Sequence, residues 1–124
     1  MATKTVEIAG KEVTFKASAA IPRIYRISFN RDIFKDLMDL RGAVKSSETG
    51  ESTLSNADLE VFENVAYLMA KHADPTQPED INDWLDQFDM FAIYEVLPVI
   101  LDLWTQNINT QIESKKKLEK LAGK

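Results

Sequence analysis

Residues 4–17 alternate apolar and polar side chains around a glycine, which is the pattern of two antiparallel strands joined by a tight turn. Val6 and Ile8 share one face of the first strand, and Val13 begins the same alternation in the second strand. The turn is expected at Ala9-Gly10 or Gly10-Lys11, because tight hairpin turns need the positive φ that glycine adopts readily. A two-stranded hairpin is marginally stable alone in water, so we expect it to pack on the helices of the same chain.

Residues 18–42 then carry apolar side chains at helical spacing, with a break near Asn30. Ser18 is a suitable helix N-cap, and Pro22 falls near the first turn, where its missing N–H costs little. The pattern predicts two short helices, or one helix broken near Asn30, and this segment is expected to end at Gly42.

Residues 43–54 are small and polar and include a glycine, which predicts a mobile loop. Ser55 and Asp58 follow with the spacing of a capping box, a motif that begins helices. Apolar residues then recur at intervals of about three and four residues, as they do along one face of a helix. The sequence therefore predicts an amphipathic helix over about 55–72.

A proline-containing break at 74–78 separates this helix from a short acidic helix over 79–88. Asp89 can cap the last helix of the pattern, and Pro98 lies inside that helix. A proline inside a helix removes a hydrogen bond and clashes with the preceding turn. We therefore expect the last helix to be kinked at Pro98 or split after Leu97.

Together these elements predict an α+β fold that is mostly α-helical, with an N-terminal β-hairpin packed on about five helices. The chain has 124 residues, 44% of them apolar, which is enough for one compact domain over 1–124. The hairpin at 4–17 precedes a helical body over 18–112, and a basic, flexible tail is expected over 113–124.

Charge is distributed unevenly along the chain. Fifteen Lys and Arg against twenty Asp and Glu give a formal net charge of −5. Residues 113–124 hold five lysines and two glutamates, a local charge of +3, so the remainder carries −8. An acidic chain lacks the basic face of a phosphate-backbone binder, so we expect no nucleic-acid partner.

The longest apolar stretch, at 91–104, is interrupted by charged residues and a proline, whereas a membrane span needs about 20 mostly apolar residues. The N-terminal residues also lack the apolar core of a secretory signal. We therefore expect a soluble, cytoplasmic protein without a membrane partner.

Catalytic and metal-binding patterns are weak in this sequence. The chain has no cysteine and a single histidine, His72, which is expected at a helix C-terminus in a structural role. Five aspartates within 74–89 lack the glycine and the closing glutamate of a calcium loop. The sequence therefore predicts no catalytic residue, no cofactor and no metal site. An enzyme could use one cluster of basic residues near Tyr25, which we expect to form surface salt bridges instead. This cluster consists of Arg23, Arg26 and Arg31.

Large apolar side chains are concentrated in the last predicted helix and just before it. They project around much of its circumference, which is more apolar surface than one buried stripe can hide. Such a helix is either central in the core or in contact with another chain, and the core is the favoured interpretation. If the helix contacts a partner, the predicted binding residues are Phe88, Phe91, Tyr94, Leu97 and Trp104.

Five short stretches together have the character of a family signature. They are PRIYR at 22–26, RDIFKDL at 31–37, AYLMAK at 66–71, DWLD at 83–86 and IYEVLP at 93–98. These stretches resemble the tail assembly chaperones of long-tailed phages (siphoviruses) and prophages of Gram-positive bacteria. The resemblance covers nearly the whole chain except 43–54, and the lysine-rich end also fits it.

The resemblance implies a non-enzymatic protein of viral morphogenesis. Such chaperones bind the tape measure protein, a long and aggregation-prone helical chain, and keep it soluble in the host cytoplasm while the tail tube assembles. They are absent from the mature virion. In many relatives, a programmed ribosomal frameshift produces a longer form that recruits tail-tube subunits. The alternative is a structural tail completion or head–tail connector protein, which is retained in the virion.

The basic tail has two further interpretations besides a solvated helix end. Its positive charge, set against an acidic body, could orient copies head to tail and build rings or spirals around a rod-like client. Lysine codons are rich in adenine, so the same run is a candidate slippery sequence for a frameshift near the end of the gene. The residues concerned are Lys115, Lys116 and Lys117.

Overall fold

The computed structural model describes residues 2–50 and 54–105, and the predicted tail at 113–124 lies outside this part. Its elements, in chain order, are β1 (Ala2–Ile8), β2 (Lys11–Ala17), α1 (Ala20–Phe29), α2 (Ile33–Glu48), α3 (Asn56–Ala73), α4 (Ile81–Leu85) and the 3-10 helix η1 (Ala92–Val96). Residues 97–105 continue from η1 as α-helix. Within the described residues, the predicted α+β, mostly helical fold with an N-terminal hairpin is confirmed.

The hairpin has the predicted turn and the predicted inner face. β1 and β2 pair antiparallel up to Ile8 opposite Lys11, so Ala9 and Gly10 form a two-residue turn with φ of 50° and 83°. Positive φ at both positions matches the twist of the strands that enter and leave the turn. Phe15 is completely buried and, together with Ile8, anchors the hairpin in the core.

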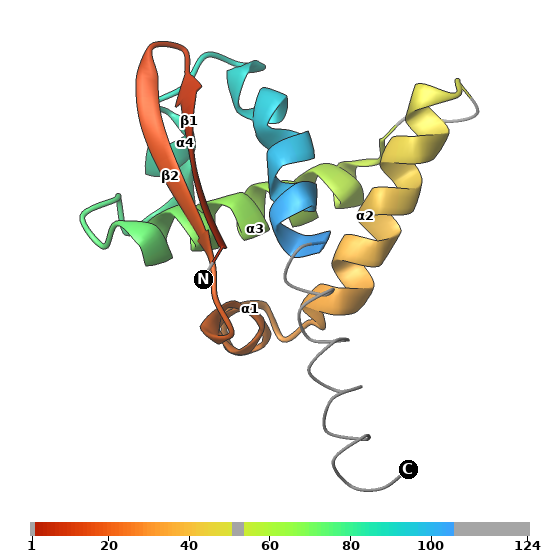
Figure 1. Ribbon diagram of the computed structural model, residues 1–124, viewed down its shortest axis with the longest axis horizontal. Coiled ribbons are helices and arrows are strands. Elements are labelled where there is room, and N and C mark those ends of the chain that lie inside the picture. The colour runs from red at the N-terminus through yellow and green to blue at the C-terminus, as the bar shows by residue number, and fades with distance from the viewer. Residues whose placement is uncertain (1, 51–53, 106–124) are drawn as a thin grey trace, which may run out of the picture.

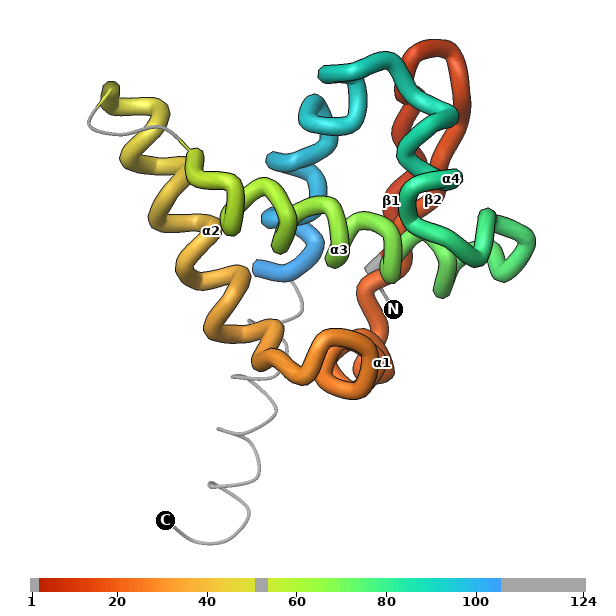
Figure 2. The backbone as a smooth tube through the Cα atoms, turned by 180° about the vertical axis from the view of Figure 1, so that it is seen from behind, coloured from red at the N-terminus to blue at the C-terminus, as the bar shows by residue number. Residues whose placement is uncertain are grey.

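α3 is the helix around which the other elements pack (Figures 1 and 2). It contacts β2, α1, α2 and α4. All residues at 65–70 are buried, so neighbours cover every side of the helix over this stretch. The predicted capping box is confirmed, because Ser55 Oγ accepts the N–H of Asp58 at 3.1 Å and the Asp58 carboxylate accepts the N–H of Ser55 at 3.0 Å.

The break near Asn30 separates α1 from α2, as the sequence predicts. Asn30 closes α1 in the left-handed conformation, with φ of 55°, and the Asp32 carboxylate then caps α2. The predicted N-cap at Ser18 is wrong by one residue, because the first turn of α1 starts from Ala19. Ser18 Oγ instead accepts the N–H of Ala20 at 3.3 Å.

α2 continues through Gly42, so the predicted end at Gly42 and the first part of the predicted loop over 43–54 are wrong. Leu40 is completely buried, and Val44 packs against the core four residues later, on the same side of the helix. This tertiary contact extends the helix over small and polar residues whose local signal favours a loop. The chain leaves α2 at Gly50, where φ is 79°.

α4 confirms part of the predicted acidic helix and docks on α3 through Trp84, which is completely buried. The Trp84 ring centroid lies 5.6 Å from that of Tyr67 and 5.2 Å from that of Phe88. Tyr67 Oη donates to the carbonyl oxygen of Pro78 at 2.5 Å, and Lys71 Nζ donates to two other carbonyl oxygens of the same loop. The proline-containing loop is therefore held against the end of α3.

The last helical segment is split close to the predicted place. η1 ends at Val96, and the α-helix that follows has Pro98 in its first turn, where a missing N–H costs little. The predicted side-chain cap at Asp89 is wrong, because it is the carbonyl oxygen of Asp89 that accepts the N–H of Ala92, at 3.0 Å. η1 lies against β1, so the segment after α4 completes the cover of the hairpin.

Replacing Gly42 by Ala should raise the free energy of unfolding by about 0.5–1 kcal/mol, because alanine favours the helix over glycine by this amount. An added Cβ meets nothing within 4 Å at this position. Gly50→Ala is the matched control and should destabilise the protein, since its φ of 79° suits glycine. Urea unfolding followed by circular dichroism measures both, and a less stable Gly42→Ala protein would contradict the helical assignment.

Candidate partner-binding site

Two of the stretches that carry the family resemblance, 22–26 and 31–37, meet at the corner between α1 and α2. Asp36 of α2 is buried there, with 4% of its surface exposed. Arg31 donates to its two carboxylate oxygens at 2.7 and 2.9 Å. Tyr25 of α1 donates its hydroxyl hydrogen to Oδ2 of the same carboxylate at 2.5 Å. These three residues, the corner cluster, tie α1 to α2.

The charges of the corner cluster support one another. The hydrogen bonds from Arg31 lower the pKa of Asp36, and they outweigh burial, which acts in the opposite direction. Burial raises the pKa of Tyr25, and the hydrogen bond to Asp36 raises it further, so the phenol keeps its proton. The bond to Asp36 also raises the pKa of Arg31. The cluster is therefore a stable arrangement of one anion, one cation and one neutral donor.

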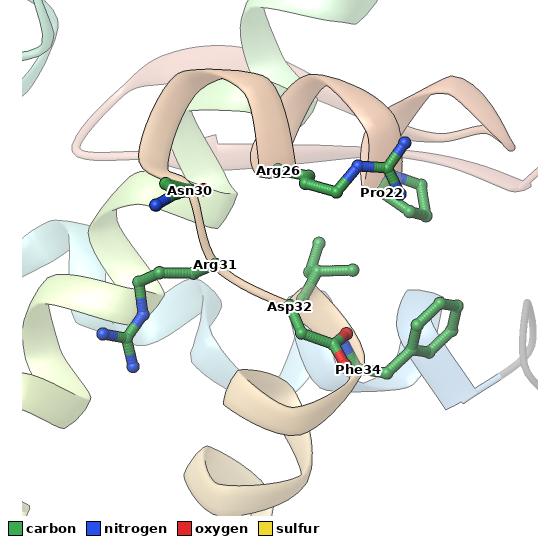
Figure 3. A pocket seen from close by; sticks show the side chains of 7 residues that line it. Pro22, Arg26, Asn30, Arg31, Asp32 and Phe34 are labelled. Atoms are coloured by element: carbon green, nitrogen blue, oxygen red, sulfur yellow. The ribbon is translucent and has the colours of Figure 1, made fainter.

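A surface hollow of about 430 Å³ lies beside the corner cluster, between the end of α1 and the start of α2 (Figure 3). Arg26 extends along α1 toward Pro22, whereas Arg31 points to the opposite side. Asp32 and Phe34 line the hollow from α2. The hollow combines apolar side chains with charges of both signs.

The arginine cluster that an enzyme could use is only partly assembled. Among the described residues, Arg31 is the member of this cluster that pairs with a carboxylate, while Arg23 and Arg26 are exposed on α1. The carboxylate with a lowered pKa is Asp36, and both of its oxygens already accept hydrogen bonds inside the fold. The expected salt bridge is therefore present at Arg31, with a buried partner, and it serves helix packing.

His72 lies in the last turn of α3, as predicted, and has a partner that the sequence did not indicate. Its Nε2 lies 3.0 Å from Oγ of Ser18, in the connection between β2 and α1. Ser18 has only 8% of its surface exposed, so its hydroxyl is enclosed and not open to a substrate. The pair fastens the strand–helix connection to α3.

The residues predicted to bind a partner do not form one surface. Phe88, Leu97 and Trp104 are buried in the core of the single chain. Tyr94 is half-buried against α3, and Phe91 is 73% exposed. Most of the large apolar side chains of this last segment therefore fill the core, which is the interpretation that the sequence favoured. The tail contacts predicted at Lys115, Lys116 and Lys117 lie outside the described residues.

Large apolar side chains are exposed at a few positions in the described part of the chain. They are Ile27, Met38, Met90 and Phe91, and we call them the exposed apolar set. Ile27 lies on α1 and Met38 on α2, while Met90 and Phe91 lie between α4 and η1. The helical pattern does not single out Ile27 as a binding residue, although its place outside the apolar stripe of α1 indicates exposure.

The aspartates within 74–89 that make side-chain contacts serve local structure. Asp74 accepts hydrogen bonds from Thr76 and Gln77, and the bonds from Thr76 are the main reason that its pKa is lowered. Asp80 caps α4. In the described ranges, no three His, Asp or Glu side chains are placed to hold a metal ion.

Comparison with known proteins finds no match among family models, curated proteins or solved structures. Within 2–50 and 54–105, no helix is both long enough and apolar enough to cross a membrane.

Replacing Tyr25 by Phe should lower the free energy of unfolding by about 1–2 kcal/mol, because Asp36 then loses one hydrogen bond inside the fold. The ring still fills the same space. Tyr94→Phe is the matched control, since it removes a less buried hydroxyl that donates to Glu63 at 2.8 Å, and it should cost less. Chemical denaturation measures both variants, and a Tyr25→Phe protein of wild-type stability would contradict the tie between α1 and α2.

Acid should weaken the fold through Asp36. Its pKa is lower in the folded state, so its stabilising contribution is complete above the unfolded value of about 4 and is lost as the pH falls through the folded value. Asp36→Asn removes this contribution at every pH. The difference in unfolding free energy between the wild type and this variant should therefore be largest near neutral pH and shrink below about pH 4. Urea titrations across this range measure the difference, and a constant value would contradict the lowered pKa.

Proposed function

We propose that this protein is a non-enzymatic phage tail assembly chaperone, which binds the tape measure protein and keeps it soluble while the tail tube assembles. In this proposal, it acts in the host cytoplasm and is absent from the mature virion. A longer form, made by programmed frameshifting, recruits tail-tube subunits. The proposal starts from the resemblance of five stretches of the sequence to that family.

The structural observation that supports the proposal is the exposed apolar set. A long amphipathic client presents apolar stripes along its helices, and a protein that binds it needs apolar side chains that stay accessible. Two members of the set are Met38 and Met90, and methionine side chains adapt to partners of varied shape. Because the set is spread over α1, α2 and the segment before η1, it can hold an extended client at several points.

The corner cluster supports the same function in a different way. It ties α1, which carries Ile27, to α2, which carries Met38. Because the cluster fixes α1 and α2 relative to each other, less conformational entropy is lost when Ile27 and Met38 bind a client. The hollow beside the cluster gives the client a recess between the two helices.

The alternative function is a tail completion or head–tail connector protein. Such a protein also presents apolar surfaces to its neighbours, so the exposed apolar set is compatible with it. The two functions differ in the fate of the protein, since a connector stays in the virion and a chaperone does not. Detection in purified particles therefore distinguishes them.

Replacing Met90 and Phe91 together by Ser should reduce the tape measure protein that co-purifies with a tagged copy by about tenfold, since a few apolar anchors supply most of the energy of such contacts. Both side chains are exposed, so the stability of the fold should change by less than about 0.5 kcal/mol each. Lys35→Ser with Asp39→Ser is the matched control, because it removes two exposed polar side chains next to Met38 on α2.

The measurement uses the native gene cluster with an N-terminal tag on this protein and mass spectrometry of its product lengths and bound proteins. A long helical partner, with or without an extended second product, supports the chaperone function. Tube or capsid proteins alone, together with detection of the protein in virions, contradict it and favour the connector. A single product without any tail protein contradicts both.

A further inference from the structure

A second hollow, of about 270 Å³, is formed by α3, α4 and the segment that leads into η1. Its acidic lining residues are Glu63, Asp86 and Asp89, and none of the described residues that line it is a Lys or an Arg. Its remaining lining residues are Leu85, Phe88, Met90, Ile93 and Tyr94. We call it the acidic hollow, because it places negative charge around an apolar floor.

The carboxylates of the acidic hollow are accessible to a partner. Asp86 and Asp89 are exposed. Glu63 accepts the hydroxyl hydrogen of Tyr94 at 2.8 Å, which holds this carboxylate at the side of the hollow. Met90 is 81% exposed at the same place, so an apolar contact is available beside the charges. The hollow therefore fits a segment that carries both positive charge and apolar side chains.

The chain itself contains a segment of this chemistry. Residues 113–124 hold five lysines and two glutamates, a charge of +3. Leu118 and Leu121 add two apolar side chains at a spacing that suits one face of a helix. We propose that residues 113–124 of a second copy bind in the acidic hollow, with lysines against its carboxylates and leucines against its apolar floor.

The course of the chain favours a second copy over the same copy as the source of this segment. Ile93 and Tyr94 of η1 line the hollow, and the helix over 97–105 that follows η1 carries the chain about 12 Å further, at 1.5 Å per residue. The same copy must reverse direction to bring residues 113–124 back to its own hollow. The corresponding segment of a second copy can reach the hollow without this reversal of the chain.

The contact joins two different surfaces, so it is heterologous. A copy that receives a neighbour's tail still has its own tail available for the next hollow, and growth continues as a spiral or closes as a ring. This assembly goes beyond client binding, because it needs no client. It also gives the uneven charge of the chain a specific role, which is to set the direction of stacking.

Two charge-reversal variants test the proposal. The hollow variant carries Asp86→Lys and Asp89→Lys, and the tail variant carries the substitutions Lys115→Glu, Lys116→Glu and Lys117→Glu. Analytical ultracentrifugation of the full chain at low salt should show that the wild type associates as its concentration rises, and that each variant alone associates at least about tenfold more weakly. An equimolar mixture of the two variants should associate like the wild type, because each reversed surface meets its complement on the other chain.

A double reversal at Asp39→Lys and Glu48→Lys is the matched control, since it changes the net charge as much as the hollow variant does but lies on α2, outside the hollow. It should associate like the wild type, and circular dichroism should show wild-type helix content for every variant. Salt at about 1 M, where screening acts within about 3 Å, should weaken wild-type association.

Three results overturn the proposal. They are a wild-type chain that stays monomeric at every concentration, a control that loses association as the hollow variant does, and a mixture that fails to associate. The first result would indicate that the tail binds the hollow of its own copy or binds no hollow. Because these measurements contain no client, they fail or succeed independently of the proposed chaperone function.

Discussion

The burial of α3 is the constraint on which the rest of the structure depends. Since residues 65–70 are all buried, other elements must cover every side of the helix, and β2, α1, α2 and α4 do so together. A helix enclosed in this way cannot shift without opening several close-packed contacts at once. Its ends are held separately, by the capping box of Ser55 and Asp58 at the start and by Lys71 and Tyr67 against the proline-containing loop at the end.

The candidate surfaces take their positions from this arrangement. The corner cluster fixes α1 and α2 to each other on one part of α3, and the acidic hollow uses Glu63 of α3 together with residues from the segment that follows α4. Met90 belongs both to the exposed apolar set and to the lining of the acidic hollow. In the two proposals, therefore, client and neighbouring copy meet at Met90, and occupation of one surface changes access to the other.

Local patterns predicted the elements well and their environment less well. The hairpin and the capping box could be predicted because their signals are local. These signals are the apolar–polar alternation with Gly10 at the turn, and the Ser55–Asp58 spacing. α2 extends beyond its predicted end because burial of Leu40 and packing of Val44 outweigh the weak helix propensity around Gly42. At the site, the Ser18–His72 bond joins residues 54 positions apart, and no local pattern signals it. Likewise, helical spacing showed that Phe88, Leu97 and Trp104 are apolar face residues but not that other elements would cover them.

The hairpin is made first, and part of its cover is made last. Ile8 and Phe15 share one core with Ile100, and β1 lies against η1. β2 can pack on α3 once that helix has been translated, but β1 lacks the cover that η1 supplies until the final described segment is made. The core is therefore complete only after this segment has been added. A chain interrupted before this segment keeps the apolar face of β1 without the cover that η1 supplies.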